Sequence, residues 1–377
     1  MNPKQLILRA FYSVCRCLPV KKKTVLLFSY YGGHYGGSPK YIGEYLSKHS
    51  DFKVIWAFID PSAHPGCVAD KTVRYGRFGY YFRLATSGIL ITNYRMTEEF
   101  RKRKGQRYLQ TWHSSLRMKM IEKDAENTLP ENYLRMAKID SPQIDWLLAG
   151  SEKSREIFER AFWYTGVIAT TGTPQCDVLF NTPEGIGEKV RRCLGIGKDK
   201  KTLLYAPTFR KNDDLSVYLS GTEELLEAVT ARFGGEWVLL VRLHPHLLRE
   251  ADSMSFGERV INATAYDDAQ ELLAVSDVLL SDYSAIVFDF ALTHRPCFLY
   301  TPDIDRYTSG DRGLYFRPDE LPFISAGTPE ELFLAIRNFD ADKYEEDITG
   351  FLKRIGSCED GHACERVLKL VERGIRK

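Results

Sequence analysis

Long apolar runs are missing from this sequence. No stretch of about 20 consecutive apolar residues occurs, so no membrane-spanning helix is predicted. The first residues also lack an apolar core followed by a small-residue cleavage site, which argues against a signal peptide. We therefore expect a protein that is made and kept in the cytoplasm. No internal repeat or low-complexity segment is evident either.

Paired cysteines and a strong charge of one sign are missing too. The eight cysteines are scattered and contain no C-x-x-C pair, which excludes a typical zinc site or disulfide framework and favours reduced thiols. They are Cys15, Cys17, Cys67, Cys176, Cys193, Cys297, Cys358 and Cys364. Because 52 basic residues nearly balance 50 acidic ones, the composition gives no reason to expect a nucleic-acid partner.

The composition of the chain is that of an ordinary globular protein. The chain contains 377 residues, 44% hydrophobic and 27% charged, which is enough for two domains with a core each. Short apolar runs such as 24–29, 52–59 and 88–93 are too short for helices and alternate with helix-like segments. This alternation restarts after residue 198 and is typical of parallel α/β sheets. The fold class we predict is two α/β domains with parallel sheets.

The domain boundaries follow from these patterns. The segment at 182–201 mixes glycine and charge around one short helix and is the expected linker. The expected parts are a basic amphipathic segment at 1–23, a first domain at 24–181, a second domain at 202–357 and a final segment at 358–377.

The N-terminal segment 1–23 is expected to begin with an amphipathic helix. Its apolar side carries Leu6, Ile7, Phe11, Val14 and Leu18. Arg9, Arg16 and Lys21–Lys23 supply positive charge, and a second basic run, RKRK, lies at 101–104. One interpretation is a helix in the interface of an anionic membrane. The alternative is a helix packed on its own domain beside solvated charges, and RKRK could also serve acceptor phosphates.

Candidate chemistry lies where strands end. Parallel α/β domains bind ligands at the carboxyl ends of their strands. His113 follows one such strand and could accept a proton from an alcohol, with Arg117 and Lys119 close behind it. In the second half, Thr208, Arg210, Arg242 and His244 follow adjacent strands and suit a diphosphate. The segment SDYSAIVFDFA at 281–291 then offers hydroxyls at a helix start, with Ser284 as the expected N-cap.

Two other motifs are less specific. YYGGHYGGS at 30–38 lies between a strand and a helix, but its glycines match neither the P-loop nor the G-x-G-x-x-G spacing. It is either a flexible turn or an acceptor-binding loop. Asp303 and Asp305 form a D-x-D, yet Pro302 and Arg306 favour an ordinary charged loop over a metal site.

The order and wording of these motifs resemble the CDP-glycerol glycerophosphotransferase family, which includes teichoic acid primases and polymerases and their capsule relatives. The resemblance spans most of the chain. Its specific segments are 93–113, 121–126, 161–180, YAPTFR at 205–210, RLHP at 242–245, 281–307, RGLYF at 312–316 and 359–367.

The resemblance implies a GT-B-like arrangement of two Rossmann-like domains. CDP-glycerol is then expected mainly on the C-terminal domain, a lipid-linked glycan acceptor on the N-terminal one, and the final helix is expected to cross back. His113 and His244 match the two essential histidines of the family. The donor-binding residues we expect are Thr208, Arg210, Arg242, Ser281, Asp282, Tyr283, Ser284 and Asp289, with Glu365 as another match. On the acceptor side we expect Gly32, Gly33, Ser38, Arg117 and Lys119.

Two departures from the family pattern weaken the substrate assignment. Ser114-Ser115-Leu116 replaces the usual Gly-Thr-Pro after the histidine, and Gln175 replaces an arginine that could meet phosphate. The expected reaction is transfer of glycerol phosphate to an acceptor hydroxyl with release of CMP, with no cofactor required and Mg²⁺ left open. CDP-ribitol, a sugar nucleotide, or a catalytically silent scaffold are the alternatives. We expect the protein at the inner face of the cell membrane, and its oligomeric state is not predicted.

Overall fold

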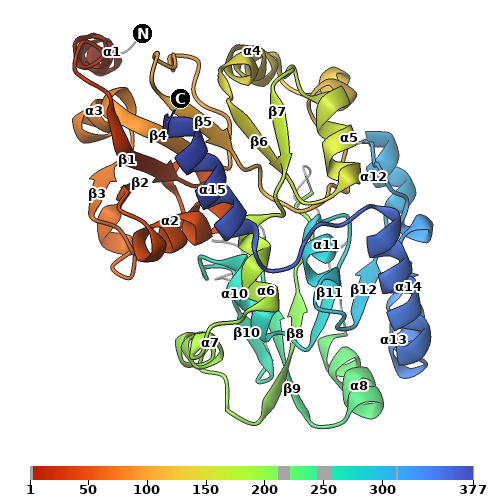
Figure 1. Ribbon diagram of the computed structural model, residues 1–377. Coiled ribbons are helices and arrows are strands. Elements are labelled where there is room, and N and C mark those ends of the chain that lie inside the picture. The colour runs from red at the N-terminus through yellow and green to blue at the C-terminus, as the bar shows by residue number, and fades with distance from the viewer. Residues whose placement is uncertain (1–2, 211–220, 244–256, 311–312, 377) are drawn as a thin grey trace. The chain divides into compact units, whose positions relative to one another are not determined.

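The computed structural model describes residues 3–210, 221–243, 257–310 and 313–376 (Figure 1). Contacts between residues divide the chain into two compact units. Unit 1 comprises Met1–Ser115, Glu122–Asp177 and Cys358–Lys377, and unit 2 comprises Leu116–Ile121 and Val178–Ser357. Each unit is built on its own parallel sheet, and the two are described separately below.

In the described residues, unit 1 is organised around a seven-stranded parallel sheet of order β3-β2-β1-β4-β5-β6-β7. The strands are β1 (Lys21–Phe28), β2 (Lys53–Phe58), β3 (Lys71–Arg74), β4 (Ser87–Thr92), β5 (Arg107–Gln110), β6 (Trp146–Ala149) and β7 (Val167–Thr170). This is the strand order of the Rossmann fold. The chain adds β2 and β3 on one side of β1 and then continues with β4 on the other side. Central strands are buried along most of their length, which explains their continuous apolar runs.

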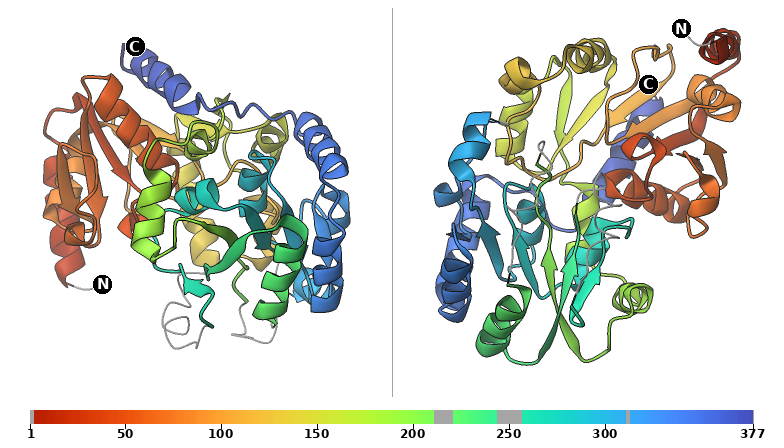
Figure 2. Two further views of the ribbon diagram at one scale, coloured as in Figure 1. Left: turned by 90° about the horizontal axis from the view of Figure 1, so that it is seen from below. Right: turned by 180° about the vertical axis from the view of Figure 1, so that it is seen from behind.

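Helices cover both faces of this sheet. Those of unit 1 are α1 (Pro3–Cys15), α2 (Gly37–His49), α3 (Phe78–Thr86), α4 (Glu131–Asp140), α5 (Glu152–Ala161) and α15 (Ala363–Arg376). Short 3-10 turns lie at η1 (Tyr30–Gly32), η2 (Pro61–Ala63), η3 (Glu122–Thr128), η4 (Ser141–Gln143) and η5 (Pro174–Cys176). The C-terminal helix α15 contacts α2, and the views from below and from behind show the same neighbours (Figure 2).

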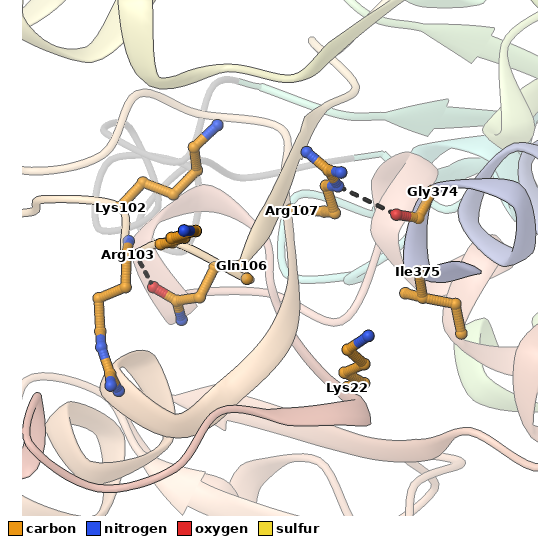
Figure 3. A pocket seen from close by; sticks show the side chains of 9 residues that line it. Lys22, Lys102, Arg103, Gln106, Arg107, Gly374 and Ile375 are labelled. Carbon is orange, nitrogen blue, oxygen red and sulfur yellow. Dashed lines mark hydrogen bonds between the residues drawn. The ribbon is translucent and has the colours of Figure 1, made fainter. Parts of the chain in front are cut away.

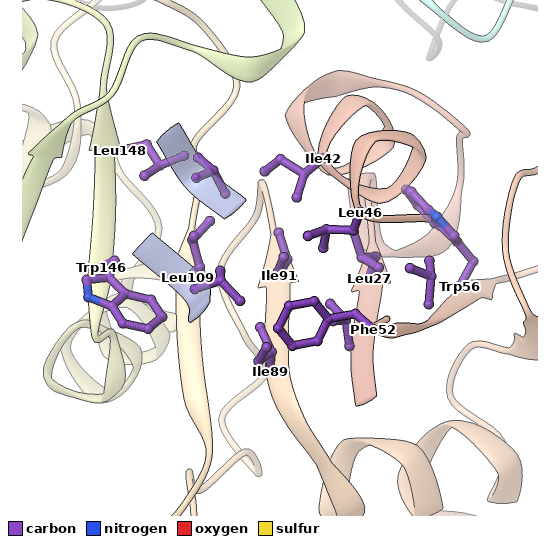
Figure 4. Packing of buried hydrophobic residues seen from close by; sticks show 14 of the residues in the cluster. Leu27, Ile42, Leu46, Phe52, Trp56, Ile89, Ile91, Leu109, Trp146 and Leu148 are labelled. Carbon is purple, nitrogen blue, oxygen red and sulfur yellow. The ribbon is translucent and has the colours of Figure 1, made fainter. Parts of the chain in front are cut away.

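The core of unit 1 contains residues from both the N-terminal and the C-terminal parts of the chain. Ile42 and Leu46 of α2 pack with alternate strand residues such as Leu27 and Ile91 (Figure 4). Val367 of α15 belongs to the same buried cluster. Docking of the C-terminal helix therefore completes the core of the N-terminal sheet.

Unit 2 repeats the architecture. Its described residues form a six-stranded parallel sheet of order β10-β9-β8-β11-β12-β13. The strands are β8 (Lys200–Tyr205), β9 (Glu236–Val241), β10 (Val260–Asn262), β11 (Val278–Ser281), β12 (Cys297–Tyr300) and β13 (Ile324–Ala326). The reversal of strand order falls between β8 and β11, so a ligand site is expected at their carboxyl ends.

The helices of unit 2 flank this sheet. They are α7 (Ile186–Leu194), α8 (Thr222–Phe233), α10 (Ala269–Val275), α11 (Ile286–Ala291), α12 (Ile304–Gly310), α13 (Pro329–Arg337) and α14 (Ala341–Arg354), with a 3-10 turn η8 (Pro318–Glu320). The short helix α6 (Asp177–Phe180) lies at the change from unit 1 to unit 2. No helix in the described part of the chain combines the length and the apolar character needed to cross a membrane.

A short segment soon after His113 packs with unit 2. Lys119 forms an isolated antiparallel bridge with Leu314. The Met120 N–H donates to the Gly313 carbonyl at 2.8 Å, and the Tyr315 N–H donates to the Met118 carbonyl at 2.8 Å. Residues 116–121 are thus held by unit 2, although the chain before and after them belongs to unit 1.

Candidate active site

His113 stands on a strained turn at the carboxyl end of β5. The strand stops at Gln110 because Trp112 adopts a left-handed backbone with φ of 55°, which is costly for a bulky residue. The Gln110 Oε1 accepts a hydrogen bond from the Trp112 N–H at 3.0 Å. The Trp112 side chain is buried and stacks on the His113 ring at 4.6 Å, whereas His113 itself is exposed. The turn therefore leaves the His113 side chain exposed, while the neighbouring Trp112 side chain is fixed by burial.

Tyrosines from two neighbouring strand ends surround this histidine. Tyr94, which follows β4, has its ring 5.6 Å from that of His113. Tyr30 and Tyr31, which follow β1, contact Tyr94 at 5.3 and 4.9 Å. Both have positive φ values, 49° and 54°. Such backbone strain is concentrated at functional sites, where the surrounding structure maintains it.

A buried ionic cluster lies beneath the turn. Arg95 is 1% exposed and donates to Glu122 at 2.9 Å and to Asp140 at 3.2 Å. Its guanidinium also lies 4.3 Å from the ring centre of Phe162, which packs against Trp112. Burial raises the pKa of Asp140 to about 6, although Arg95 acts in the opposite direction.

Hydrogen bonds connect this cluster to the turn. The Tyr108 hydroxyl donates to Asp140 at 3.3 Å, and the Gln110 amide donates to the Tyr108 hydroxyl at 3.0 Å. Gln110 in turn holds the Trp112 backbone. A continuous buried network thus runs from Arg95 to the residue that carries His113.

Asn93 adds a polar group at the point where the strand order reverses. It is fully buried, and its Oδ1 accepts a hydrogen bond from the Tyr30 N–H at 3.0 Å. Its Nδ2 has no hydrogen-bond partner among the described residues. Sequence reasoning missed Asn93 and Tyr94 as site residues, although Asn93 ends a predicted strand and Tyr94 follows it directly.

The predicted acceptor-side residues occupy different environments. Gly32, with φ of 84°, is in the turn after β1, where its carbonyl accepts from the Ile59 N–H at 2.8 Å. Gly33 follows it. Ser38 is fully buried in α2 and its hydroxyl accepts from the Gln175 N–H at 3.3 Å. Arg117 is buried and Lys119 half-buried in the segment held by unit 2.

The predicted donor residues converge at the reversal point of the unit 2 sheet. The Thr208 N–H, after β8, donates to both carboxylate oxygens of Asp282, after β11, at 2.9 and 3.0 Å. Arg210 is buried and donates to Asp282 at 2.9 Å and to Asp303 at 2.9 and 3.1 Å. Its charge is therefore already balanced by two carboxylates inside the unit.

Asp303 lies in the turn before α12, as a charged loop residue should, but its side chain is only 7% exposed. Its carboxylate pairs with Arg210 and accepts from the Tyr283 hydroxyl at 3.1 Å. Tyr283 stacks on Tyr307 at 4.2 Å, and Lys119 lies 5.4 Å from the Tyr307 ring. The sequence could not predict this ion pair, because Arg210 supplies the counter-charge from nearly a hundred positions earlier.

The remaining donor predictions are spread around this centre. The Ser281 hydroxyl donates to the Ala206 carbonyl at 2.6 Å, and Asp289 accepts from Gln270 at 2.7 Å inside the unit. Arg242 directs its guanidinium to the carbonyls of Ala263 and Tyr266.

Two predictions at this end of the chain need separate statements. Ser284 is not the N-cap of α11, because that position is Ala285 and the helix begins at Ile286, so this prediction was wrong by one residue. His244 lies outside the described residues. The described residues contain no cluster of three His, Cys, Asp or Glu side chains that could hold a metal ion.

Two Rossmann-like units, each with a parallel sheet and with polar residues at its strand ends, define an α/β fold of the GT-B-like class. Comparison with solved structures agrees. The wall teichoic acid polymerase TagF superposes with a TM-score of 0.85 at 29% identity, covering 98% of this chain and 93% of that one. The predicted fold class is confirmed.

The model of the CDP-glycerol:poly(glycerophosphate) glycerophosphotransferase family matches residues 10–373, so the chain belongs to that family. A teichoic acid poly(glycerol phosphate) polymerase of Bacillus spizizenii is 30% identical, covering 98% of each chain. The polymerase of the same description from Staphylococcus epidermidis is also 30% identical over 95% of this chain, but the chain spans only 52% of that relative. The predicted family resemblance is confirmed.

Proposed function

We propose that this protein transfers glycerol phosphate from CDP-glycerol to an acceptor hydroxyl, releasing CMP. The observation that carries the proposal is His113, an exposed imidazole on a strained turn that a buried network maintains, in a chain of this family. In the proposed reaction the acceptor oxygen attacks the β-phosphorus of CDP-glycerol. The new P–O bond forms as the bond to CMP breaks, and the imidazole takes the acceptor proton.

The residues of unit 2 are proposed to hold the donor. Arg210, Asp282 and Asp303 form a preorganised cluster at the reversal point of the sheet. Because Arg210 is already paired, we assign it to positioning the loops that receive the diphosphate, and we assign to His244 and the residues before α11 the direct stabilisation of the leaving group. Preorganised charge of this kind is the main contribution a protein makes to phosphoryl transfer.

The first test is His113→Ala. CMP release should fall to background, because no other group is proposed to accept the proton, while CDP-glycerol binding should be largely retained. His49→Ala is the matched control, since His49 is an exposed histidine of the same unit that only stacks on Tyr45. Turnover by His113→Ala at the rate of the control would refute the assignment.

The acceptor is proposed to be a lipid-linked glycan or teichoic-acid-type chain, in wall or capsule polymer synthesis, met at the inner membrane surface. Support comes from α1. Its Tyr12 and Cys15 are buried and its Phe11 packs on Phe78 at 4.9 Å, so the helix is fixed to unit 1. Its other side exposes Leu6, Ile7 and Val14 by 50, 58 and 68%. Both sequence interpretations of this helix are thus compatible, because different faces serve them.

Membrane binding is tested with substitutions, because deleting α1 would uncover α3. The triple variant Leu6→Ser, Ile7→Ser, Val14→Ser should co-sediment less with phosphatidylglycerol vesicles. The control is Ile59→Ser, Val68→Ser, Val167→Ser, which removes three exposed apolar residues elsewhere in unit 1. Equal sedimentation of the two variants would remove α1 from the proposal.

A further inference from the structure

A basic cavity of about 450 Å³ opens in unit 1, at the edge of the sheet where strands begin (Figure 3). Five of its nine lining residues are cationic and none is acidic. The cations are Lys22, Lys102, Arg103, Lys104 and Arg107. Lys22 comes from the start of β1, the next three from the loop before β5, and Arg107 from the first position of β5. The last turn of α15 closes the cavity with Gly374 and Ile375.

The loop that carries three of these cations is held firmly. Gln106 is buried, and its amide donates to the carbonyls of Leu84 and Ser87 at 2.9 and 2.7 Å. Arg103 donates to the carbonyls of Ala85 and Leu18 at 2.6 and 2.8 Å. The loop backbone and the Arg103 side chain are therefore preorganised, which reduces the entropy cost of binding a ligand.

The charges of the cavity are poorly compensated. Asp145 pairs with Lys102 at 2.6 Å and with Arg107 at 3.3 Å. Arg103 uses neutral carbonyl acceptors, and within the described residues neither Lys22 nor Lys104 has an ion pair. Like charges brought together in this way repel one another, and a bound anion would relieve that repulsion.

This cavity is separate from the His113 site. Arg107 begins β5 and His113 follows its end, so the two lie at opposite ends of this strand, which spans about 10 Å at roughly 3.3 Å per residue. The cavity therefore lies at the opposite edge of the sheet from the strand ends where the reaction is proposed.

We propose that this cavity binds a phosphate group. A phosphate or phosphodiester matches the grouping of lysine and arginine donors, and multiple donors on one anion give charge-assisted hydrogen bonds. The ligand could be a soluble phosphate ester or the headgroup of an anionic lipid. The second source is within reach because Arg103 bonds to Leu18, which lies three residues after the end of α1 and is itself exposed.

The test uses Lys22→Ala/Lys104→Ala, which removes two exposed, unbonded cations and spares the loop anchors. Lys48→Ala/Lys71→Ala is the control, because it removes the same charge from exposed positions of unit 1 outside the cavity. Binding of pyrophosphate and glycerol 3-phosphate is measured by calorimetry, and vesicle binding by sedimentation with phosphatidylglycerol against phosphatidylcholine. We expect the cavity variant to bind roughly tenfold more weakly than the control, since each basic residue contributes noticeably to anion attraction.

The soluble-anion and vesicle experiments distinguish the two possible sources of the phosphate group. A selective loss with the soluble anions supports a phosphate ester, and a selective loss with phosphatidylglycerol vesicles supports a lipid headgroup. Equal affinities of the two variants for every probe would overturn the proposal. Lys104→Glu changes the charge by the same two units at a single exposed position, so it should weaken binding to a similar extent. CMP release with a soluble acceptor that carries no phosphate should not change in any of these variants, because such an acceptor offers RKRK no phosphate to bind. Failure of this site is therefore distinguishable from failure of the proposed reaction.

Discussion

The residue that most shapes the candidate site is Trp112, because its left-handed backbone ends β5 early and presents His113. That conformation is maintained by hydrogen bonding rather than by glycine. The Gln110 side chain accepts from the Trp112 N–H and donates to the Tyr94 carbonyl and the Tyr108 hydroxyl. We therefore regard Gln110 as the positioning residue for the histidine.

Gln110→Leu tests this role. The change leaves the buried Trp112 N–H without its acceptor, a cost of about 1 to 3 kcal/mol, and kcat should fall at least about tenfold as the turn relaxes. The KM for CDP-glycerol should change little, because the proposed donor residues are in unit 2. Gln143→Leu is the control, since Gln143 braces the loop at Lys102 instead. Wild-type kcat in Gln110→Leu would contradict the positioning role.

Asp140 is expected to make the free energy of unfolding depend on pH. Burial raises its pKa to about 6, above the value of about 3.9 expected in the unfolded chain. The folded state therefore holds the proton more tightly, so the contribution of Asp140 to the free energy of unfolding is largest at low pH and is lost as the pH rises through about 6.

Asp140→Asn removes this titration. The free energies of unfolding of the wild type and the variant are compared in urea from about pH 7.5 down to about pH 5, and the difference should shift in favour of the wild type on acidification. A difference that stays constant over this range would show that Asp140 does not titrate there. Taking the difference cancels the other carboxylates, which the two proteins share.

At the scale of elements, α15 ties the end of the chain into the first sheet. Asp177 accepts hydrogen bonds from the N–H groups of Ala363 and Cys364 at 2.9 and 2.8 Å, which satisfies the helix start. At the other end a Cβ on Gly374 would meet the Trp146 ring at 2.2 Å. The helix can lie this close to β6 only because residue 374 has no side chain.

Gly374→Ala should therefore destabilise unit 1 by about 1 to 3 kcal/mol through overpacking, measured by urea unfolding. Gly350→Ala is the matched control, because Gly350 lies in α14 with nothing within 4 Å of the added methyl group. That control should gain about 0.5 to 1 kcal/mol, since alanine is the better helix former. Destabilisation of equal size in both variants would mean that the Trp146 contact is not the cause.

Most strands could be predicted from the sequence, but the edge strand β3 could not. The apolar runs of β1, β2 and β4 are buried on both faces and are visible without a structure. The edge strand β3 was missed because only Val73 of its four residues is buried, which leaves little hydrophobic pattern. β5 was predicted to reach Trp112 because nothing in its composition signals a positive φ.

The candidate site, too, could be predicted only where local sequence patterns indicate it. His113 and the donor segment could be located because they follow recognisable strands. The ionic partners Asp140 and Asp303 could not, since long-range pairs such as Arg210 with Asp303 depend on the tertiary fold. Asp289 and Ser38 are named by motif, but each is buried and bonded within its unit. Their predicted ligand contacts stay predictions.

At the scale of the whole molecule, we propose different roles for different regions. The carboxyl ends of the unit 1 strands carry the proposed base, and those of unit 2 carry a preorganised charged cluster. A basic cavity and an exposed apolar stripe on α1 lie elsewhere in unit 1. With family membership, the first two places support the proposed glycerol phosphate transfer, and the other two are proposed to hold anionic material near the protein.

The measurement that tests the central claim most directly is CMP release from CDP-glycerol by the purified wild-type protein. It is run with a panel of lipid-linked acceptor analogues, beside CDP-ribitol and UDP-sugars as competing donors. The account predicts CMP that depends on acceptor and appears from CDP-glycerol in preference to the other donors. Release from another donor alone, or from none with any acceptor, would contradict it.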